Sequence, residues 1–297
     1  MRWSYDIHRD GKQTSFHGNP LITEDLILIG TDLSCAPDGE GHVYAFERNT
    51  GKAKWKYKST SVPTDILRIG QTIYFGSFQD RWSAVNLKSG ELVWSFSTNT
   101  ANPDCTMVKS PVADATHLYL TGLDGFVYSL DTATGRVIWK RELSAPPSTA
   151  LALKDNALFV GTTDNHLYRL NPVSGATLAD LVVDAMPVGR LTLTDDSLLL
   201  FLENRSDHSG YIVAVDPRLK SERWKQKSTL DWASERPNVW KGLVLAGNCR
   251  GELAAFRASD GAAQWKLNLK GCIRSIGNSD DMLFVGVQEG TVYALRP

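Results

Sequence analysis

The sequence predicts an all-β fold made of repeated four-stranded sheets, and two observations support this. A theme of about 40 residues recurs along the 297-residue chain. Each copy has an aromatic–small–aliphatic strand, a polar turn that usually ends in Gly, and a strand that ends at Trp. No segment shows a sustained apolar period of 3.6 residues, so we expect helix content close to nil.

Six segments carry the theme, and their spacing is regular. In chain order they are Val43–Trp55, Ser83–Trp94, Val127–Trp139, Leu167–Gly175, Val213–Trp224 and Ala254–Trp265. The first three tryptophans are 39 and 45 residues apart, and the last two are 41 apart. The fourth copy lacks its Trp, because Gly175 is followed by Ala176, Thr177, Leu178 and Ala179.

A further pair of strands precedes each theme, as in residues 156–161 and 281–286. Each repeat therefore holds four short strands joined by turns rich in Gly, Asp, Asn and Ser. A period near 40 with four strands per unit is typical of a β-propeller blade. A sheet that is apolar on both faces is stable only between neighbouring sheets, and a Trp ring buries roughly 200 Å² there.

The two ends of the chain suggest how the last blade is completed. The final repeat ends at residues 292–297 after its third strand, and residues 2–7 look like the missing fourth strand. Such a strand would remove an exposed sheet edge. We therefore predict a single-domain, seven-bladed β-propeller over residues 1–297, its last blade closed by the N-terminal strand. The expected blades are residues 20–58, 59–97, 106–142, 148–183, 188–227, 235–268, and 273–297 together with 2–7.

The repeat resembles the PQQ-like (pyrroloquinoline-quinone enzyme) repeat family, whose theme is matched by residues 128–139. Two departures are the absent Trp of the fourth repeat and the segment Pro217–Ser221, which replaces the Gly turn of the fifth. The resemblance implies a binding role, since seven-bladed members are mostly non-enzymatic. The chain is similar in class to the propeller lipoprotein of the outer-membrane β-barrel assembly machinery, although it lacks that protein's lipidated N-terminal Cys.

Composition narrows the functional classes. The net charge is −1, so no bulk field favours nucleic acid, and no apolar stretch approaches the roughly 18 to 20 residues of a membrane span. As written, the chain has no signal peptide, which predicts a cytoplasmic protein; a removed leader would make it periplasmic or secreted. Four cysteines form no CxxC pair, which favours free thiols. If a disulfide exists, we expect it between Cys249 and Cys272.

In a propeller, the blade-to-blade crossings and the loops between second and third strands share one face, where long loops favour binding. The residues expected at the channel mouth on this face include four cations and two acids. The candidate binding residues are His17, Asp65, Lys109, Arg190, Glu235, Arg236, Arg274 and Trp232. The positive bias favours an acidic peptide or a small anionic ligand. The alternative is a self-paired rim, for instance Glu235 with Arg274.

These observations favour a non-catalytic, monomeric scaffold that presents its loop-rich face to a protein or peptide partner. The alternatives are a PQQ-binding oxidoreductase of the quinoprotein type and a carbohydrate-binding or sensory module. No adjacent cysteines, calcium loop, HExxH pair or nucleophile elbow occurs. We therefore predict no cofactor, no metal and no catalytic residue, with PQQ disfavoured.

Overall fold

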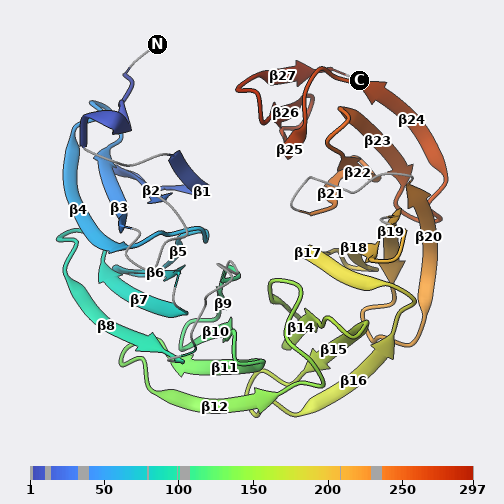
Figure 1. Ribbon diagram of the computed structural model, residues 1–297, viewed down its shortest axis with the longest axis horizontal. Helices are drawn as coiled ribbons and strands as arrows, with labels where there is room; N and C mark the ends of the chain where they lie inside the picture. The colour runs from blue at the N-terminus through green and yellow to red at the C-terminus, as the bar shows by residue number, and fades with distance from the viewer. Residues whose placement is uncertain are drawn as a thin grey trace. The chain divides into compact units, whose positions relative to one another are not determined.

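A computed structural model describes residues 3–10, 15–32, 40–78, 80–98, 100, 108–207, 209–228 and 236–296. Within these residues the chain is all-β, apart from one short 3-10 helix at Ile7–Asp10. The chain divides into two compact units, Met1–Pro147 and Ser148–Pro297. Each unit is built from antiparallel sheets that follow one another in chain order (Figure 1).

The first unit contains three four-stranded sheets. The first consists of β1 (Ser15–Ile22), β2 (Leu26–Asp32), β3 (Glu40–Glu47) and β4 (Ala53–Thr60). The second consists of β5 (Leu67–Ile69), β6 (Thr72–Ser77), β7 (Arg81–Asn86) and β8 (Leu92–Ser97). The third consists of β9 (Val112–Ala113), β10 (His117–Thr121), β11 (Phe126–Asp131) and β12 (Val137–Glu142).

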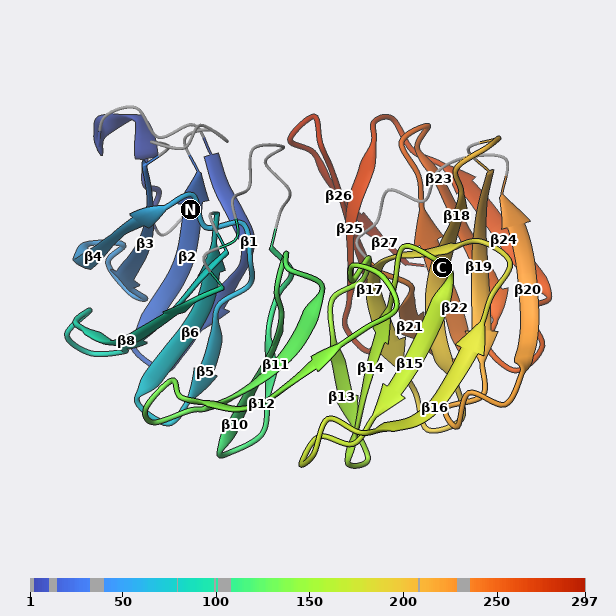
Figure 2. The same cartoon turned by 60° about the horizontal axis from the view of Figure 1, so that its bottom comes forward.

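The second unit contains four sheets, seen edge-on in Figure 2. The fourth sheet consists of β13 (Ala152–Lys154), β14 (Ala157–Gly161), β15 (His166–Leu170) and β16 (Thr177–Val182). The fifth consists of β17 (Met186–Leu193), β18 (Leu198–Asn204), β19 (Ser209–Val215) and β20 (Glu222–Ser228). The sixth consists of β21 (Asn238–Trp240), β22 (Leu243–Gly247), β23 (Glu252–Arg257) and β24 (Ala263–Asn268). The seventh consists of β25 (Ile273–Asn278), β26 (Leu283–Val287) and β27 (Val292–Leu295).

The core of each unit lies between neighbouring sheets. One cluster joins Leu28 and Val43 of the first sheet to Phe75 of the second. Another joins Phe159 of the fourth sheet to Leu200 of the fifth. The two middle strands of the second sheet, β6 and β7, are almost wholly buried because that sheet packs against the first sheet on one side and the third on the other.

The recurrent Trp performs the packing role that the repeat predicts. In three sheets its ring covers a turn glycine of the next sheet and its indole Nε1 donates to a backbone carbonyl of the same turn; we call this the Trp–Gly contact. The three cases are Trp55 with Gly90 and the Leu87 oxygen (3.1 Å), Trp94 with Gly135 and the Thr132 oxygen (2.9 Å), and Trp224 with Gly261 and the Ala258 oxygen (2.9 Å).

Glycine is required at these turns for two reasons. Gly90 has φ +75°, and a Cβ added there would lie 2.7 Å from Cδ2 of Trp55. A side chain would therefore be strained by the backbone conformation and would collide with the indole. Ala45 stands opposite Trp55 on the neighbouring strand, and its small side chain leaves room for the indole ring beside it.

The closure of the last sheet by residues 2–7 stays a prediction. Among the described residues, 3–6 form no strand and the seventh sheet has three strands. The Trp3 ring covers Gly51, and its Nε1 donates to the Arg48 oxygen at 2.9 Å. Trp3 therefore makes with the first sheet the Trp–Gly contact that the fourth-strand Trp of three other sheets makes with the next sheet. The segment also packs through Tyr5, whose ring centroid lies 4.6 Å from that of Phe46.

Candidate functional site

In the first unit, the predicted mouth residues of neighbouring sheets are joined by hydrogen bonds. The Asp65 carboxylate accepts from the Asn19 backbone N (2.9 Å) and from Asn19 Nδ2 (3.2 Å). The Asp65 backbone N–H donates to Ser110 Oγ at 3.1 Å. Three sheets are thus linked through Asp65. Lys109 is half-buried beside Ser110, and His17 lies on β1, paired with Gly30.

In the second unit, three of the predicted cations lie in different sheets. Arg190 is half-buried on β17, Arg236 is exposed just before β21, and Arg274 is exposed at a bulge of β25. Arg274 donates to Gln288 Oε1 at 2.7 Å, so its guanidinium is anchored to its own sheet. Trp232 and Glu235 lie outside the described residues.

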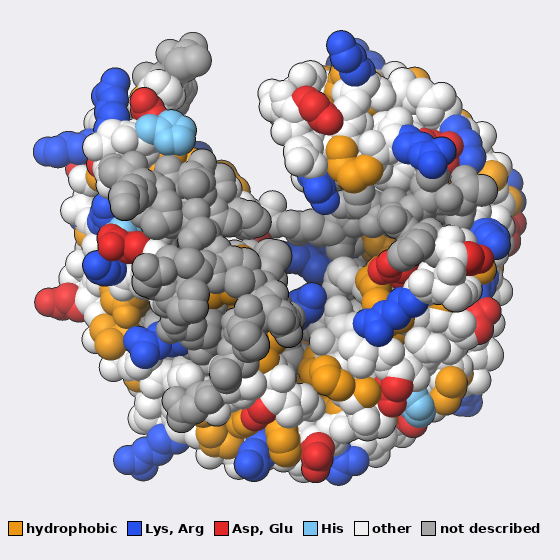
Figure 3. Space-filling view, viewed as in Figure 1, with side chains coloured by type: hydrophobic (Ala, Val, Ile, Leu, Met, Phe, Trp, Pro, Cys, Tyr) orange, Lys and Arg blue, Asp and Glu red, His pale blue; other side chains and the backbone are white. Residues whose placement is uncertain are grey.

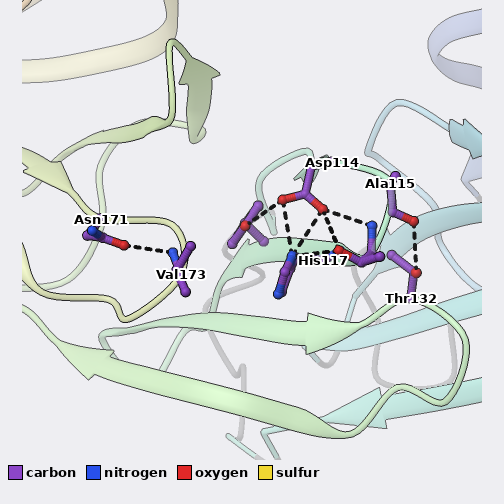
Figure 4. A network of polar contacts seen from close by, with 8 residues as sticks. Asp114, Ala115, His117, Thr132, Asn171 and Val173 are labelled. Atoms are coloured by element: carbon purple, nitrogen blue, oxygen red, sulfur yellow. Dashed lines mark hydrogen bonds and ion pairs between the residues drawn. The ribbon is translucent and has the colours of Figure 1, made fainter.

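Polar contacts at the surface account for the histidines that start strands. Asp114, in the turn before β10, accepts from the backbone N atoms of Thr116 and His117 at 2.8 Å and from the Tyr119 hydroxyl at 2.9 Å (Figure 4). Burial opposes ionisation of Asp114, but these hydrogen bonds together lower its pKa to about 2. His117 stacks on Tyr119, and His166 stacks in the same way on Tyr168. These two histidines therefore pack within their own sheets.

A disulfide joins Cys249, in the turn after β22, to Cys272, immediately before β25. The favoured prediction of free thiols is therefore wrong for these two residues, and the pair named as the alternative is the one that forms. Spacing did not decide this, because the two cysteines meet only when the sixth and seventh sheets pack. Cys35 and Cys105 lie outside the described residues.

Two pockets occupy comparable positions, each at a junction between neighbouring sheets on the side of the hairpin turns. The Lys88 pocket lies between the first and second sheets, has a volume of about 270 Å³, and is lined by Lys54, Arg68 and Lys88 with Glu24 and Asp25. This side is the opposite end of the strands from the predicted mouth residues, because β1–β2 and β7–β8 turns form it.

The Arg169 pocket lies between the fourth and fifth sheets and is larger, at about 480 Å³. Its apolar part includes Phe159 and Leu193. Its cations are Lys154, Arg169, Arg218 and Arg223, and its acids are Asp155, Asp195, Asp196 and Asp216. Lys154 Nζ pairs with Asp195 at 2.7 Å, which lowers the pKa of that carboxyl, and Arg223 lies 3.8 Å from Asp216.

The cations of this pocket were not among the predicted site residues. A signal was nevertheless present, because Arg169 occupies the repeat position that is Ala45, Ala84 or Ala214 elsewhere. It coincides with the missing Trp of the same repeat. Two departures at paired positions indicate an altered junction more strongly than either alone.

Other features of the described residues constrain the chemistry. No group of three or more His, Cys, Asp or Glu side chains is arranged to hold a metal ion there. In the same residues, no helix has the length and apolarity needed to cross a membrane. On the face seen in Figure 3, Lys and Arg side chains are interspersed with Asp and Glu over each unit.

Comparison with known proteins gives consistent matches along the chain. The family model described as outer membrane protein assembly factor BamB matches residues 1–106 and 81–297. BamB of Legionella pneumophila is 25% identical over 173 residues, covering 54% of this chain and 41% of that protein. BamB of Yersinia pestis is 22% identical over 291 residues, covering 93% of this chain and 60% of that protein. The chain thus spans about half the length of these curated relatives.

Structural comparison establishes the fold. The crystal structure of BamB from Moraxella catarrhalis aligns with a TM-score of 0.77 at 20% identity, covering 95% of this chain and 85% of that one. The seven sheets are accordingly the blades of a seven-bladed β-propeller fold. With the family model matched over both of its segments, the chain belongs to the family of the outer membrane protein assembly factor BamB.

Proposed function

We propose that this protein is a non-catalytic scaffold that binds a protein partner during outer membrane protein assembly. The observation that carries the proposal is the family match across the whole chain, since the named relatives are assembly factors. The predicted cations Arg236 and Arg274 suit this role, because they lie just before and at the start of strands β21 and β25, and Arg190 lies within β17. Arginine on a rigid support loses little conformational freedom on binding a carboxylate.

The disulfide supports an extracytoplasmic setting for this work. Structural disulfides persist in oxidising compartments such as the bacterial periplasm and are rare in the cytoplasm. Cys249–Cys272 connects two sheets and lies two residues from Arg274. We infer that the protein acts in the periplasm as a monomer, without a cofactor or a metal, and that it binds neither nucleic acid nor, through a span of its own, the membrane.

Site-specific cross-linking tests the proposal. A photo-cross-linking residue is placed at Arg190, Arg236 or Arg274 in the source bacterium, with Lys52, an exposed residue of the β3–β4 turn in the first sheet, as the control. We expect adducts with an outer membrane assembly protein at the three arginine positions and none at Lys52. Adducts that form equally at Lys52, or none anywhere, would contradict the proposal.

Charge reversal gives a second, quantitative test. Arg190→Glu, Arg236→Glu and Arg274→Glu should each weaken partner binding, because an acidic partner is then repelled. Lys52→Glu should leave binding unchanged. Thermal-shift scans with PQQ and calcium complete the test: stabilisation by the quinone together with dye reduction would favour the oxidoreductase alternative.

A further inference from the structure

The junction between the fourth and fifth sheets differs from the others at two paired positions. In the first, second and fifth sheets a small residue stands opposite the Trp, as Ala45 does opposite Trp55. In the fourth sheet the pair is Arg169 opposite Ala179. The indole has been replaced by a methyl group, and the methyl group by a guanidinium. The exchange removes the ring that fills this junction elsewhere.

The facing turn of the fifth sheet has changed as well. In place of a glycine turn, Leu219 adopts φ +57° and donates its backbone N–H to the Asp216 oxygen at 2.7 Å. Its side chain is only 4% exposed and packs in the cluster that contains Ala157 and Phe159. This junction therefore lacks both residues of the Trp–Gly contact, the Trp of the fourth sheet and the turn glycine of the fifth. Leu219 refills only part of the space, and the Arg169 pocket is what is left.

Partners and burial together distinguish one of the four cations of the pocket. Lys154 and Arg223 face the carboxylates of Asp195 and Asp216, as described above. Among the described residues the guanidinium groups of Arg169 and Arg218 have no hydrogen bond or ion pair, and of these two Arg218 is exposed whereas Arg169 is half-buried. A partly desolvated guanidinium without a carboxylate is costly for the free protein. It is correspondingly well prepared to accept one from a ligand, through two parallel hydrogen bonds.

The remaining side chains limit what the ligand can be. The acidic rim residues Asp155 and Asp196 are exposed and repel a second negative charge, which disfavours phosphate dianions and polyanions. The lining also includes the apolar side chains of Phe159 and Leu193. A ligand that satisfies both features carries one carboxylate beside an aromatic ring. A volume of about 480 Å³ accommodates such a pair of side chains.

We propose that the Arg169 pocket is a second binding site, which takes a partner segment bearing one carboxylate next to an aromatic side chain. This deepens the proposed function and rests on it, because it requires a protein partner. The pocket is formed by hairpin turns, at the opposite strand ends from Arg236 and Arg274. A partner that reaches both sites is held at two separate points, which raises affinity through effective concentration.

Fluorescence anisotropy with a short dye-labelled peptide that carries Glu beside Trp tests this site. Arg169→Gln should weaken binding about tenfold or more, the factor expected when a charged hydrogen-bonded partner is lost. Arg169→Lys should recover only part of the affinity, because Lys cannot bind a carboxylate bidentately. The matched control Lys88→Gln, in the smaller pocket, should bind as the parent does. Equal binding by parent and Arg169→Gln would overturn the proposal.

Refilling the pocket gives an independent check. The double variant Arg169→Ala, Ala179→Trp restores the common pair of the repeat and should abolish peptide binding while circular dichroism stays that of the parent. If the double variant misfolds, the Arg169→Gln comparison still decides. Peptides with Gln for Glu, or Ser for Trp, should bind more weakly than the original. Equal binding of these peptides would refute the assigned ligand.

Free succinate tests the assigned ligand. If it competes as strongly per molecule as the peptide does, the site takes small carboxylates and the peptide assignment is wrong.

Two further outcomes separate this proposal from the proposed function. If the parent protein binds the peptide and Arg169→Gln does not, but no cross-links form at Arg190, Arg236 and Arg274, the proposed function fails and the Arg169 site stands. If the cross-links form and the peptide does not bind, only the Arg169 site fails.

Discussion

The junctions between the first and second sheets and between the fourth and fifth sheets use the same backbone plan in different ways. At the first, Trp55 covers Gly90 and leaves a pocket of about 270 Å³ nearby. At the second, Arg169 and Leu219 stand in place of that pair, and the pocket grows to about 480 Å³. The outer two strands of the sheet that carries each junction pair antiparallel in both cases. A repeat fold can therefore give up one packing contact without losing its sheets.

The comparison teaches where function can arise in a repetitive fold. An indole between sheets contributes apolar burial and one hydrogen bond, which makes a junction stable and closed. Replacing it by a cation trades some of that stability for a recognition group. Sites that depart from the local rule of a fold are expected to be functional or strained. The fourth repeat is such a place.

The largest effect should separate the two junctions by stability. Trp55→Ala should lower the free energy of unfolding by about 3–5 kcal/mol, because a large apolar ring and its hydrogen bond to Leu87 are lost. Arg169→Ala should change it by less than about 1 kcal/mol, since no partner is orphaned. Urea unfolding of both variants measures the difference. Comparable losses would show that Arg169 is a packing residue.

The disulfide provides a third way of joining neighbouring sheets, at the junction of the sixth and seventh. Reducing Cys249–Cys272, whose sequence separation is 23, should cost about 3 kcal/mol because the unfolded chain gains freedom. Unfolding in urea with and without dithiothreitol measures this. Cys249→Ser with Cys272→Ser should melt like the reduced parent and should no longer respond to the reductant. A variant that still responded would place the effect at Cys35 or Cys105.

Substitution of the turn residues should also lower the free energy of unfolding more at the first junction than at the second. Gly90→Ala should cost about 1–3 kcal/mol, because φ +75° is unfavourable for Ala and the new Cβ meets the indole. Lys220→Ala, at an exposed position of the β19–β20 turn in the fifth sheet, should stay within about 0.5 kcal/mol of the parent. Thermal melting of the two variants compares them. A costly Lys220→Ala would mean that the fifth turn is also under steric control.

The smallest expected difference concerns pH. Burial, followed by the nearby charge of Lys56, lowers the pKa of His42 in the first sheet from 6.5 to about 4. The unfolded chain therefore binds the proton more tightly, so this contribution is complete above pH 6.5 and is lost as pH falls towards 4. His42→Gln should flatten the pH dependence of the melting temperature in this range. An unchanged slope in the variant would assign the acid sensitivity to other groups.

The sequence was most informative where local chemistry repeats. The spacing of Trp55, Trp94 and Trp224 predicted the number of sheets, their four-strand pattern and the glycine turns, and the structure confirms these features for six of the seven sheets. Each depends on residues within about 40 positions of one another. The closing strand at residues 2–7 stays a prediction, and Trp3 makes with Gly51 the contact that a fourth-strand Trp makes in three other sheets.

The candidate sites also combine features that the sequence shows with features that only the packing of sheets decides. That Arg169 and Ala179 depart from the repeat is visible in the sequence, because the period itself defines the expected residue. That Leu219 turns inward, that a pocket remains, and that Cys249 meets Cys272 were decided by packing between sheets. Sequence periodicity determines what each sheet contains, whereas the space between two sheets depends on side chains that are distant in the chain and meet only after both have folded.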